Sequence, residues 1–358
     1  MLVNLAYLLN EPTGTTTYAL NLLPSLTELN PLLLATPACG LKEYYAVPAN
    51  LTAEFGIAGH VRRLLWTQFR LPALCRNHSK KLQTSDLLFS PITEAPIGTN
   101  CRFVVTVHDL TPLRFPSISK PLNWLYRYYV PQVLQAAEHI ICDSQATADD
   151  IMQFYGLSAQ KITPILLAYD AQNFRPLNIE QQNYFLVLGR QAPYKNIAAA
   201  ISAFDQLPQK DKFELWIAGP FDRRYTPNLT SQAEALGLAS QVKFLNYIPY
   251  TELPTLLSQS LALIFPSLWE GFGLPALEAM ACGTPVIASN LASIPEVTAD
   301  AAILVNPYKL YELTQAMTDI IKDPQLRHQL SWAGIKRSQE FSWDKTGKAT
   351  VALLKNYL

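Results

Sequence analysis

Two glutamates, Glu270 and Glu278, flank a glycine-rich turn and are separated by seven residues. The apolar run 261–265 before this turn predicts a buried strand, and Pro275 falls where the first turn of a short helix is expected. The free N–H groups and the positive dipole end at a helix start attract an anion. Carboxylates beside an anion site make sense where the ligand also carries hydroxyl groups. The spacing therefore predicts a site for a polyhydroxylated, phosphate-bearing ligand such as a sugar phosphate.

Two cations follow another apolar run, 184–188, which also predicts a strand. Arg190 and Lys195 lie in the loop directly after it. Preorganised cations can stabilise the negative charge that develops on a leaving phosphate group. Taken alone, however, an arginine and a lysine after a strand are more often solvated surface charges, so both interpretations stay open at this point.

A His-Asp pair, His108 and Asp109, ends the predicted strand 103–107. Open α/β sheets bind ligands at the carboxyl ends of their strands, so we expect His108 in the active site. Asp109 is expected either to orient His108 or to cap the next turn. Ser144 stands at a similar strand end, but helix capping explains it fully and it is not a candidate site residue.

Short apolar strands alternate with longer amphipathic segments, which predicts a parallel α/β architecture. In the first half we expect strands at 2–8, 87–89, 103–107 and 139–142 and helices at 18–29 and about 123–137. In the second half we expect strands at 184–188, 213–218, 242–245, 261–265 and 285–288, helices at 197–207, 232–236 and 252–259, and two C-terminal helices. The predicted organisation is a first domain at 1–170, a polar linker at 171–183, a second domain at 184–340, and a C-terminal helix at 341–358 that packs back toward the first domain.

Composition limits the function classes. A chain of 358 residues suggests about two domains, each with its own core. Its 28 basic and 28 acidic residues cancel, which argues against nucleic-acid binding because that needs a basic footprint. The five cysteines are odd in number and scattered, as expected for reduced thiols and not for a disulfide framework or a zinc site.

The sequence favours a cytoplasmic protein. Its first residues have no basic region and no cleavage site, so they predict a strand and not a signal peptide. No apolar run approaches the roughly 20 residues needed to span a bilayer. We therefore expect a cytoplasmic location, with peripheral attachment to the inner face of the membrane as an alternative.

One segment bears on that alternative. Six basic residues and no acid lie between Glu54 and Asp86, and the segment 58–81 combines them with apolar residues at helical spacing: Val61, Leu65, Trp66 and Phe69. Pro72 is expected to end this helix. Such a helix could lie on an anionic membrane near a lipid-linked acceptor. The interpretation we favour is that the apolar stripe packs on the core and the charges are solvated.

The run from Glu270 to Ile287 resembles the signature of the retaining, nucleotide-sugar-dependent glycosyltransferases of family 4, which have the GT-B fold. That signature has two glutamates separated by seven residues around Gly-Phe-Gly-Leu-Pro, followed by Glu-Ala-Met-Ala-Cys-Gly-Thr-Pro-Val-Ile, and this chain matches it throughout. The resemblance covers nearly the whole chain and is densest from 184 to 297. It implies two Rossmann-like parallel-sheet domains that face each other across a cleft, the first on the acceptor side and the second binding the nucleotide sugar.

The resemblance also implies roles for the candidate catalytic residues. Arg190 and Lys195 match the family's Gly-Arg-x-x-x-x-Lys motif, whose cations hold the donor diphosphate. Glu270 would hold hydroxyls of the sugar, and Glu278 would hold those of the ribose. His108 would lie beside the transferred sugar.

Further donor contacts follow from the same resemblance. Tyr247 and Ile248 lie where relatives contact the base. The amides expected to meet the sugar and phosphates are those of Gly271, Phe272, Gly273 and Leu274.

Gly14 matches the family's glycine-rich loop, although relatives often show two glycines there. The alternative is a plain helix-capping turn with Thr15 or Thr16 as the cap.

The resemblance implies transfer of a hexosyl unit from a nucleoside-diphosphate sugar to a glycan or lipid-linked acceptor. We expect no metal and no cofactor besides the donor, because the chain lacks the Asp-x-Asp sequence with which the other glycosyltransferase fold holds a divalent ion.

The donor expected is GDP-mannose, because the chain looks most like bacterial mannosyltransferases that build surface polysaccharide. Those relatives usually have Pro-Arg-Lys-Asn where this chain has Tyr194 in place of the arginine, which weakens the case for one base. UDP-glucose is the alternative donor. Another GT-B enzyme, such as an epimerase or a phosphorylase, and a non-catalytic nucleotide-sugar-binding protein are the other classes considered.

Overall fold

The computed structural model describes residues 1–9, 14–37, 40–82, 87–116 and 121–358. The chain divides into two compact units: Met1–Leu167 with Trp343–Leu358, and Ala168–Ser342. The expected linker 171–183 has no helix or strand, but it belongs to the second unit. Phe174 is buried there and packs edge-on against Tyr250, and Asn173 donates to the Tyr250 carbonyl (3.1 Å). The polar composition of this segment therefore marks an irregular packed segment and not a free linker.

The first unit is built on a seven-stranded sheet in which every described strand pair is parallel. Its order is β3-β2-β1-β4-β5-β6-β7. The strands are β1 (Leu2–Leu5), β2 (Leu32–Ala35), β3 (Tyr45–Ala46), β4 (Leu88–Ser90), β5 (Phe103–Val107), β6 (His139–Cys142) and β7 (Ile162–Pro164). Most of these strands are buried along their length, as the continuous apolar runs of a doubly covered parallel sheet require.

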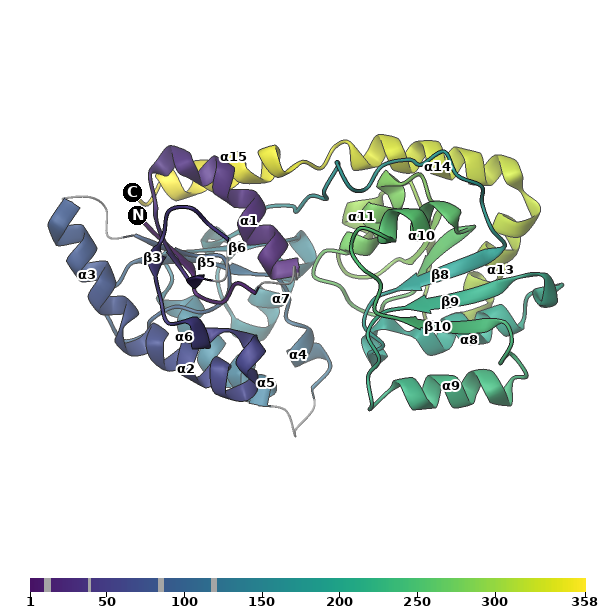
Figure 1. Cartoon of the computed structure of the whole chain (residues 1–358), viewed down its shortest axis with the longest axis horizontal. Helices are drawn as coiled ribbons and strands as arrows, with labels where there is room; N and C mark the ends of the chain where they lie inside the picture. The colour runs from purple at the N-terminus through teal and green to yellow at the C-terminus, as the bar shows by residue number, and fades with distance from the viewer. Residues whose placement is uncertain (10–13, 38–39, 83–86, 117–120) are drawn as a thin grey trace. The chain divides into compact units, whose positions relative to one another are not determined.

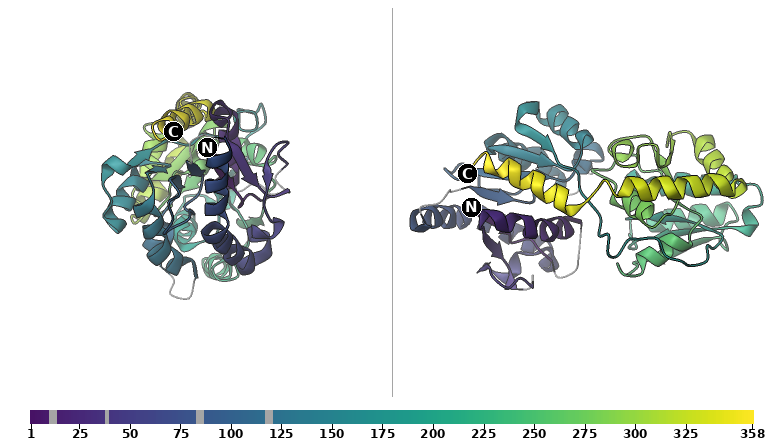
Figure 2. Two further views of the ribbon diagram at one scale, coloured as in Figure 1. Left: turned by 90° about the vertical axis from the view of Figure 1, so that its left-hand side faces the viewer. Right: turned by 90° about the horizontal axis from the view of Figure 1, so that it is seen from above.

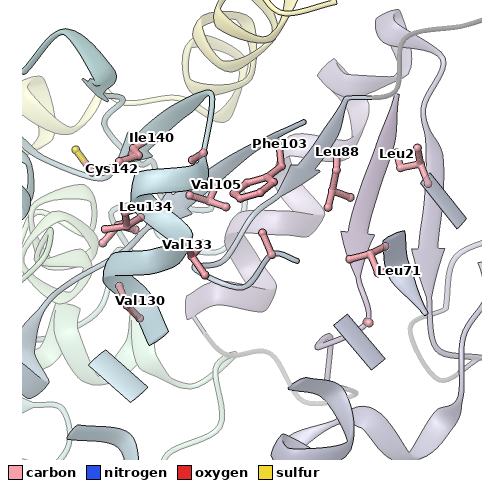
Figure 3. Close-up of a cluster of buried hydrophobic side chains, with 14 of the residues drawn as sticks. Leu2, Leu71, Leu88, Phe103, Val105, Val130, Val133, Leu134, Ile140 and Cys142 are labelled. Carbon is pink, nitrogen blue, oxygen red and sulfur yellow. The ribbon is translucent and has the colours of Figure 1, made fainter. Parts of the chain in front are cut away.

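Helices cover both faces of this sheet. They are α1 (Gly14–Leu26), α2 (Gly56–Phe69), α3 (Leu71–Leu82), α4 (Thr111–Arg114), α5 (Pro121–Trp124), α6 (Val130–Ala136), α7 (Gln145–Tyr155) and α15 (Trp343–Lys355). Phe103 and Val105 of the sheet pack with Val133 and Leu134 of α6 in one core cluster (Figure 3). The first and last helices, α1 and α15, lie side by side (Figure 2).

The helix expected at 123–137 is interrupted. A π-helical turn, Leu125–Tyr129, separates α5 from α6, and the N–H of Val130 donates to the Leu125 carbonyl. Pro131 follows directly and has no N–H with which to continue the ordinary ladder. This missing donor gives a local reason for the wider turn, and such turns occur frequently at functional sites.

The second unit has a six-stranded sheet, again with every described pair parallel, in the order β10-β9-β8-β11-β12-β13. The strands are β8 (Tyr184–Leu188), β9 (Glu214–Ala218), β10 (Val242–Asn246), β11 (Ala262–Phe265), β12 (Val286–Ser289) and β13 (Ile303–Val305). The helices are α8 (Ile197–Asp205), α9 (Thr226–Ala235), α10 (Leu253–Gln259), α11 (Leu274–Ala281), α12 (Ile294–Thr298), α13 (Leu310–Lys322) and α14 (Pro324–Ser338). Helices α10 and α11 lie over one face of the sheet, and α8 and α9 over the other (Figure 1). The expectation of two Rossmann-like parallel-sheet domains is confirmed.

The interpretation that we favoured for the basic segment is wrong. Val61, Leu65 and Phe69 lie exposed on α2, and of the predicted stripe only Trp66 is buried. The charges are not all solvated either, because Arg63 is buried and makes a two-pronged ion pair with Glu94 (2.7 and 2.8 Å).

Pro72 does not end α2. That helix ends at Phe69, and Pro72 lies at the start of α3. The side chains of Lys80 and Lys81 lie outside the described residues, as does Cys39.

Candidate functional site

The candidate site of the second unit lies at a switch point of its sheet. From β8 the chain continues to β9 on one side, whereas β11 pairs with β8 on the other side. Loops leaving the carboxyl ends of β8 and β11 therefore diverge and leave room between them, which is where open α/β sheets bind ligands. The loop 189–196 leaves β8, and the loop 266–273 leaves β11.

The structure joins these two loops through the predicted cation and the predicted carboxylate. Lys195 Nζ donates to Glu270 Oε1 at 2.6 Å, and each side chain is only 12% exposed. The Lys195 ammonium also lies 5.1 Å from the centre of the Phe265 ring, and the N–H of Leu268 donates to the Tyr194 carbonyl (2.7 Å). The lysine is thus oriented before any ligand binds, as a preorganised electrostatic site requires.

Gly273 starts helix α11 at this site. Its φ of 105° is a conformation that L-residues with a side chain rarely adopt, so glycine is needed here. Pro275 lies in the first turn, where its missing N–H costs least, as predicted. The start of α11 therefore directly follows the loop that carries Glu270.

Ser293 holds this loop and was not identified from the sequence. It is fully buried, and its Oγ lies 2.9 Å from the Glu270 carbonyl and 2.8 Å from the Phe272 carbonyl. Its position just ahead of the Ile-Pro start of α12 suggests an ordinary helix cap, but the structure shows no side-chain cap bond there. Only the folded chain reveals that the hydroxyl serves the loop after β11.

Phe272 contributes to the site through its backbone. Its side chain is buried and packs edge-on against Phe341 (6.0 Å between ring centres), whereas Gly271 and Leu274 are partly exposed. The expected amide contacts are compatible with this arrangement, because a buried ring fixes the backbone that carries them.

Glu278 lies one turn into α11 and is partly buried. Burial raises the pKa of its carboxyl to about 8, and the nearby negative charge of Asp170 adds to the increase. A carboxyl that is partly protonated near neutral pH can both donate and accept hydrogen bonds, which suits contact with hydroxyl groups.

The other predicted donor residues lie at the same sheet edge, but within the described part of the chain no hydrogen bond or ion pair joins their side chains to the Lys195–Glu270 pair. Arg190 is exposed on the loop after β8. Asp222 beside it has its pKa lowered to about 2, chiefly by hydrogen bonds from Arg224, with a smaller contribution from the charge of Arg190. Tyr247 and Ile248 follow β10, which is separated from β8 by β9.

In the first unit, His108 follows β5 and is fixed on both sides of its ring. Its Nδ1 lies 2.8 Å from Asp143 Oδ2, and its Nε2 lies 2.9 Å from the Pro91 carbonyl. Both partners accept hydrogen bonds, so the ring that satisfies both is the doubly protonated one. Burial alone would lower the His108 pKa, but the Asp143 carboxylate outweighs it and the pKa is raised.

Asp143, and not Asp109, orients this histidine. Asp109 Oδ1 instead accepts the N–H of Thr111 (2.9 Å), so Asp109 has the capping role that was its alternative. Asp143 directly follows β6, the neighbour of β5, and this adjacency was the one available signal in the sequence. Ser144 caps α7 by accepting the N–H of Thr147 (3.1 Å), as predicted.

Gly14 is the first residue of α1. Thr15 and Thr16 therefore lie inside the helix and are not its cap. Residues 10–13 of the expected glycine-rich loop lie outside the described residues.

Comparisons with known proteins agree across both units. A family model described as Glycosyltransferase Family 4 matches residues 12–173, and one described as Glycosyl transferases group 1 matches residues 170–337. The O-antigen chain mannosyltransferase RfbU of Salmonella typhimurium is 30% identical over 319 residues, covering 86% of this chain and 87% of that protein. O-antigen chain mannosyltransferase B of Escherichia coli is 26% identical over 267 residues, covering 71% and 70%.

Solved structures show the same fold. The crystal structure of Anabaena Alr3699/HepE in complex with UDP and glucose matches with a TM-score of 0.74 at 18% identity, covering 99% of this chain and all of that one. WaaG, a glycosyltransferase involved in lipopolysaccharide biosynthesis, matches with a TM-score of 0.73 at 16% identity, covering 99% of each chain.

Proposed function

Because this chain belongs to the family 4 glycosyltransferases with the GT-B fold, and is similar to bacterial mannosyltransferases, we propose that it moves mannose from GDP-mannose to a growing surface glycan. Transfer would retain the anomeric configuration and would need no metal ion. A glycosyltransferase that uses a nucleotide sugar and acts on polysaccharide is supported by the relatives, and the choice of mannose rests on their printed activities.

The Lys195–Glu270 pair is the observation that carries the proposal. When the bond between the anomeric carbon and the diphosphate oxygen breaks, the leaving group gains negative charge that must be stabilised. Lys195 is already held at the switch point and can exchange Glu270 for a phosphate oxygen. Glu270, once released, can accept hydrogen bonds from hydroxyls of the sugar. Separation of the Lys195–Glu270 pair would therefore let the lysine bind the diphosphate of the donor and the glutamate bind its sugar.

In this reaction the acceptor oxygen bonds to the anomeric carbon on the face that the diphosphate leaves. The acceptor proton passes to the departing diphosphate oxygen, so no separate base is required. Arg190 and the amides at the start of α11 would supply further positive potential. His108 would act as a fixed cation beside the sugar and not as a base, because both of its ring nitrogens are engaged.

The test is a donor screen followed by product analysis. We expect GDP-mannose to raise the melting temperature more than UDP-glucose, and slow release of GDP without any acceptor. With an acceptor glycan, nuclear magnetic resonance should show an α-linked product, and excess chelator should leave the rate unchanged. A preference for UDP-glucose would contradict GDP-mannose as the donor and favour UDP-glucose in its place. Binding without any release of nucleotide would support the non-catalytic alternative, and rescue by a divalent ion after chelation would overturn metal independence.

We propose as part of the same function that the enzyme works on the cytoplasmic face of the membrane, held there by α2. The exposed apolar side chains Ile57, Val61, Leu65 and Phe69 follow one another every four residues along this helix. Arg62 and Arg70 are exposed beside them. An exposed apolar stripe flanked by arginines is the pattern of a helix that lies on an anionic bilayer. None of the helices in the described ranges is long and apolar enough to cross a bilayer.

Sedimentation with vesicles tests this contact. We expect Phe69→Ser to reduce binding to vesicles that contain anionic lipid. Tyr308→Ser, in the second unit, is a matched control because the two side chains are 73% and 72% exposed. Equal binding by both variants, or no binding by the unaltered protein at low salt, would remove α2 from the proposal.

A further inference from the structure

The first unit contains a cavity of about 650 Å³ that no part of the proposed mechanism uses. This volume is within the range of roughly 300–1,000 Å³ found for small-molecule sites. Most of its lining is apolar or aromatic. The described lining residues are Pro112, Leu113, Pro116, Asn123, Trp124, Arg127, Tyr128, Pro131, Phe154 and Tyr155.

The aromatic wall of this cavity is built and not accidental. Trp124 and Tyr128 stack on each other, with ring centres 4.9 Å apart and planes at 28°. Trp124 is the last residue of α5, Tyr128 lies within the π-helical turn that follows it, and the two residues are 60% and 50% exposed. The guanidinium of Arg114, on α4, lies 5.5 Å from the centre of the Phe154 ring on α7, and Arg114 is itself held by the buried carboxylate of Asp150.

The polar groups around the cavity are few. Among its described lining residues, Arg127 is the one that carries a charge, and it is exposed. The Tyr155 hydroxyl already donates to the Tyr126 carbonyl (2.7 Å). No carboxylate is among those residues, although a site that grips several sugar hydroxyls needs acceptors of that kind. The lining thus suits an apolar chain, and its single cation suits an anionic group at the end of that chain.

The position of the cavity connects it to the site. Pro112 and Leu113 belong to α4, which starts three residues after His108. On another side, Gln68 of α2 donates to the Tyr129 hydroxyl (2.9 Å), which ties the helix with the exposed apolar stripe to the π-helical turn. The cavity is therefore built from elements that lead both to the carboxyl end of β5 and to the apolar surface of α2.

We propose that this cavity binds the acceptor through its lipid carrier, with the apolar prenyl or acyl chain against Trp124, Tyr128 and Phe154 and the phosphate against Arg127. This inference rests on the proposed function, and it narrows the acceptor to a glycan linked to a lipid phosphate. The aromatic wall supplies apolar contact area at low entropic cost, and a guanidinium is well suited to a phosphate.

Binding of farnesyl phosphate to the full-length protein, measured by titration calorimetry without any donor, tests the proposal. We expect Trp124→Ala and Arg127→Gln each to weaken binding by roughly tenfold, the size of one lost aromatic or charged contact. Trp332→Ala is the matched control, because Trp332 is 64% exposed against 60% for Trp124, and it also has a cation near its ring, Lys336 at 5.3 Å. Arg223→Gln, which changes an exposed arginine of the second unit, is the control for charge. Both controls should bind as the unaltered protein does.

Three comparison ligands complete the experiment. Farnesol and inorganic phosphate should each bind more weakly than farnesyl phosphate. Farnesol binding as tightly would overturn the role of Arg127. Methyl α-mannoside binding in a way that depends on Trp124, with no binding of farnesyl phosphate, would make the cavity a sugar subsite and overturn the proposal.

A light-activated farnesyl phosphate analogue provides a second measurement on the unaltered protein, which does not depend on the folding of variants. Cross-links should map to 112–116, 123–131 and 154–155, and cross-links confined to the second unit would overturn the assignment. Neither of these two measurements uses the donor. If both failed, the proposed function would therefore still stand, and failure of the donor screen would not affect the binding of farnesyl phosphate.

Discussion

Each unit places a charged pair at the carboxyl ends of neighbouring strands, but the two pairs differ in kind. Lys195 and Glu270 of the second unit come from β8 and β11, on the two sides of the switch point. His108 and Asp143 of the first unit come from β5 and β6, whereas the switch point of that sheet lies between β1 and β4. A lysine keeps its charge throughout the physiological pH range, whereas a histidine does not. The comparison teaches that the second unit holds an ammonium group at its switch point, whereas the charge of the pair in the first unit depends on pH.

The largest effect should follow from removing the permanent cation. We expect Lys195→Ala to lower kcat by roughly 10²- to 10³-fold, as loss of one preorganised electrostatic contact does in other enzymes. Release of nucleotide from the donor is the measurement. Lys243→Ala is the matched control, because Lys243 also pairs with a glutamate, Glu214 at 2.7 Å, but on an exposed strand surface. Equal rates for the two variants would contradict the role of Lys195 and remove the contrast between the two units.

The next effect concerns the carboxyl of Glu278, whose ionised form is disfavoured by burial. The Glu278 pKa is raised to about 8 by burial, well above its ordinary value. The folded state therefore binds the proton more tightly than the unfolded state, and stability should fall as pH rises from about 4.5 to 8. We expect Glu278→Gln to reduce this decline in the free energy of unfolding by a few kcal/mol. The same variant should also bind the donor more weakly. The measurement is the free energy of unfolding at several pH values, obtained by chemical denaturation. If it declined by the same amount in the variant, the effect would belong to another group.

The stabilisation that the pair in the first unit contributes should also fall as pH rises. The raised His108 pKa means that its pairing with Asp143 is fully present below the ordinary histidine pKa and is lost as pH rises through the folded value. A double-mutant cycle with His108→Gln and Asp143→Asn should give a coupling energy of about 0.5–3 kcal/mol at pH 6 and less at pH 9. Coupling that does not change with pH would mean that the pair is a neutral hydrogen bond, and the contrast with Lys195 would lose its basis.

The smallest effect should come from the residue that holds the loop after β11. Ser293→Ala removes the hydroxyl that contacts the Glu270 and Phe272 carbonyls, so Glu270 should be less well positioned. We expect the donor KM to rise several-fold while kcat changes less, in line with one neutral hydrogen bond of about 1 kcal/mol. Thr298→Ala, which removes a buried hydroxyl from the next turn of the chain, should leave KM unchanged.

The sequence predicted what depends on neighbouring residues. Strands β5, β6 and β8 have the predicted bounds, because continuous apolar runs mark buried parallel strands. The turn that carries Glu270 and Gly273 and the helix start at Pro275 also lie where they were predicted. Both depend on residues that are adjacent in the sequence.

Features that depend on packing between distant segments could not be predicted. Asp143 and Ser293 make their decisive contacts 35 and at least 21 residues away in the chain. The short strands β2, β3, β7 and β13 were missed. The exposure of the α2 stripe was missed as well, since helical spacing says that a face is apolar but not what covers it.

The return of the chain to its first unit affects how the protein is made. Helix α15 packs on α1 so closely that a Cβ at Gly347 would lie 2.1 Å from Ser25 Oγ, and Thr346 donates to the Leu166 carbonyl (2.7 Å). During synthesis the ribosome releases the whole second unit before it releases this helix, so the second unit can fold while the first unit is still incomplete. Loss of α15, for example through a protease cut just before it, should therefore destabilise the first unit and leave the fold of the second unit intact.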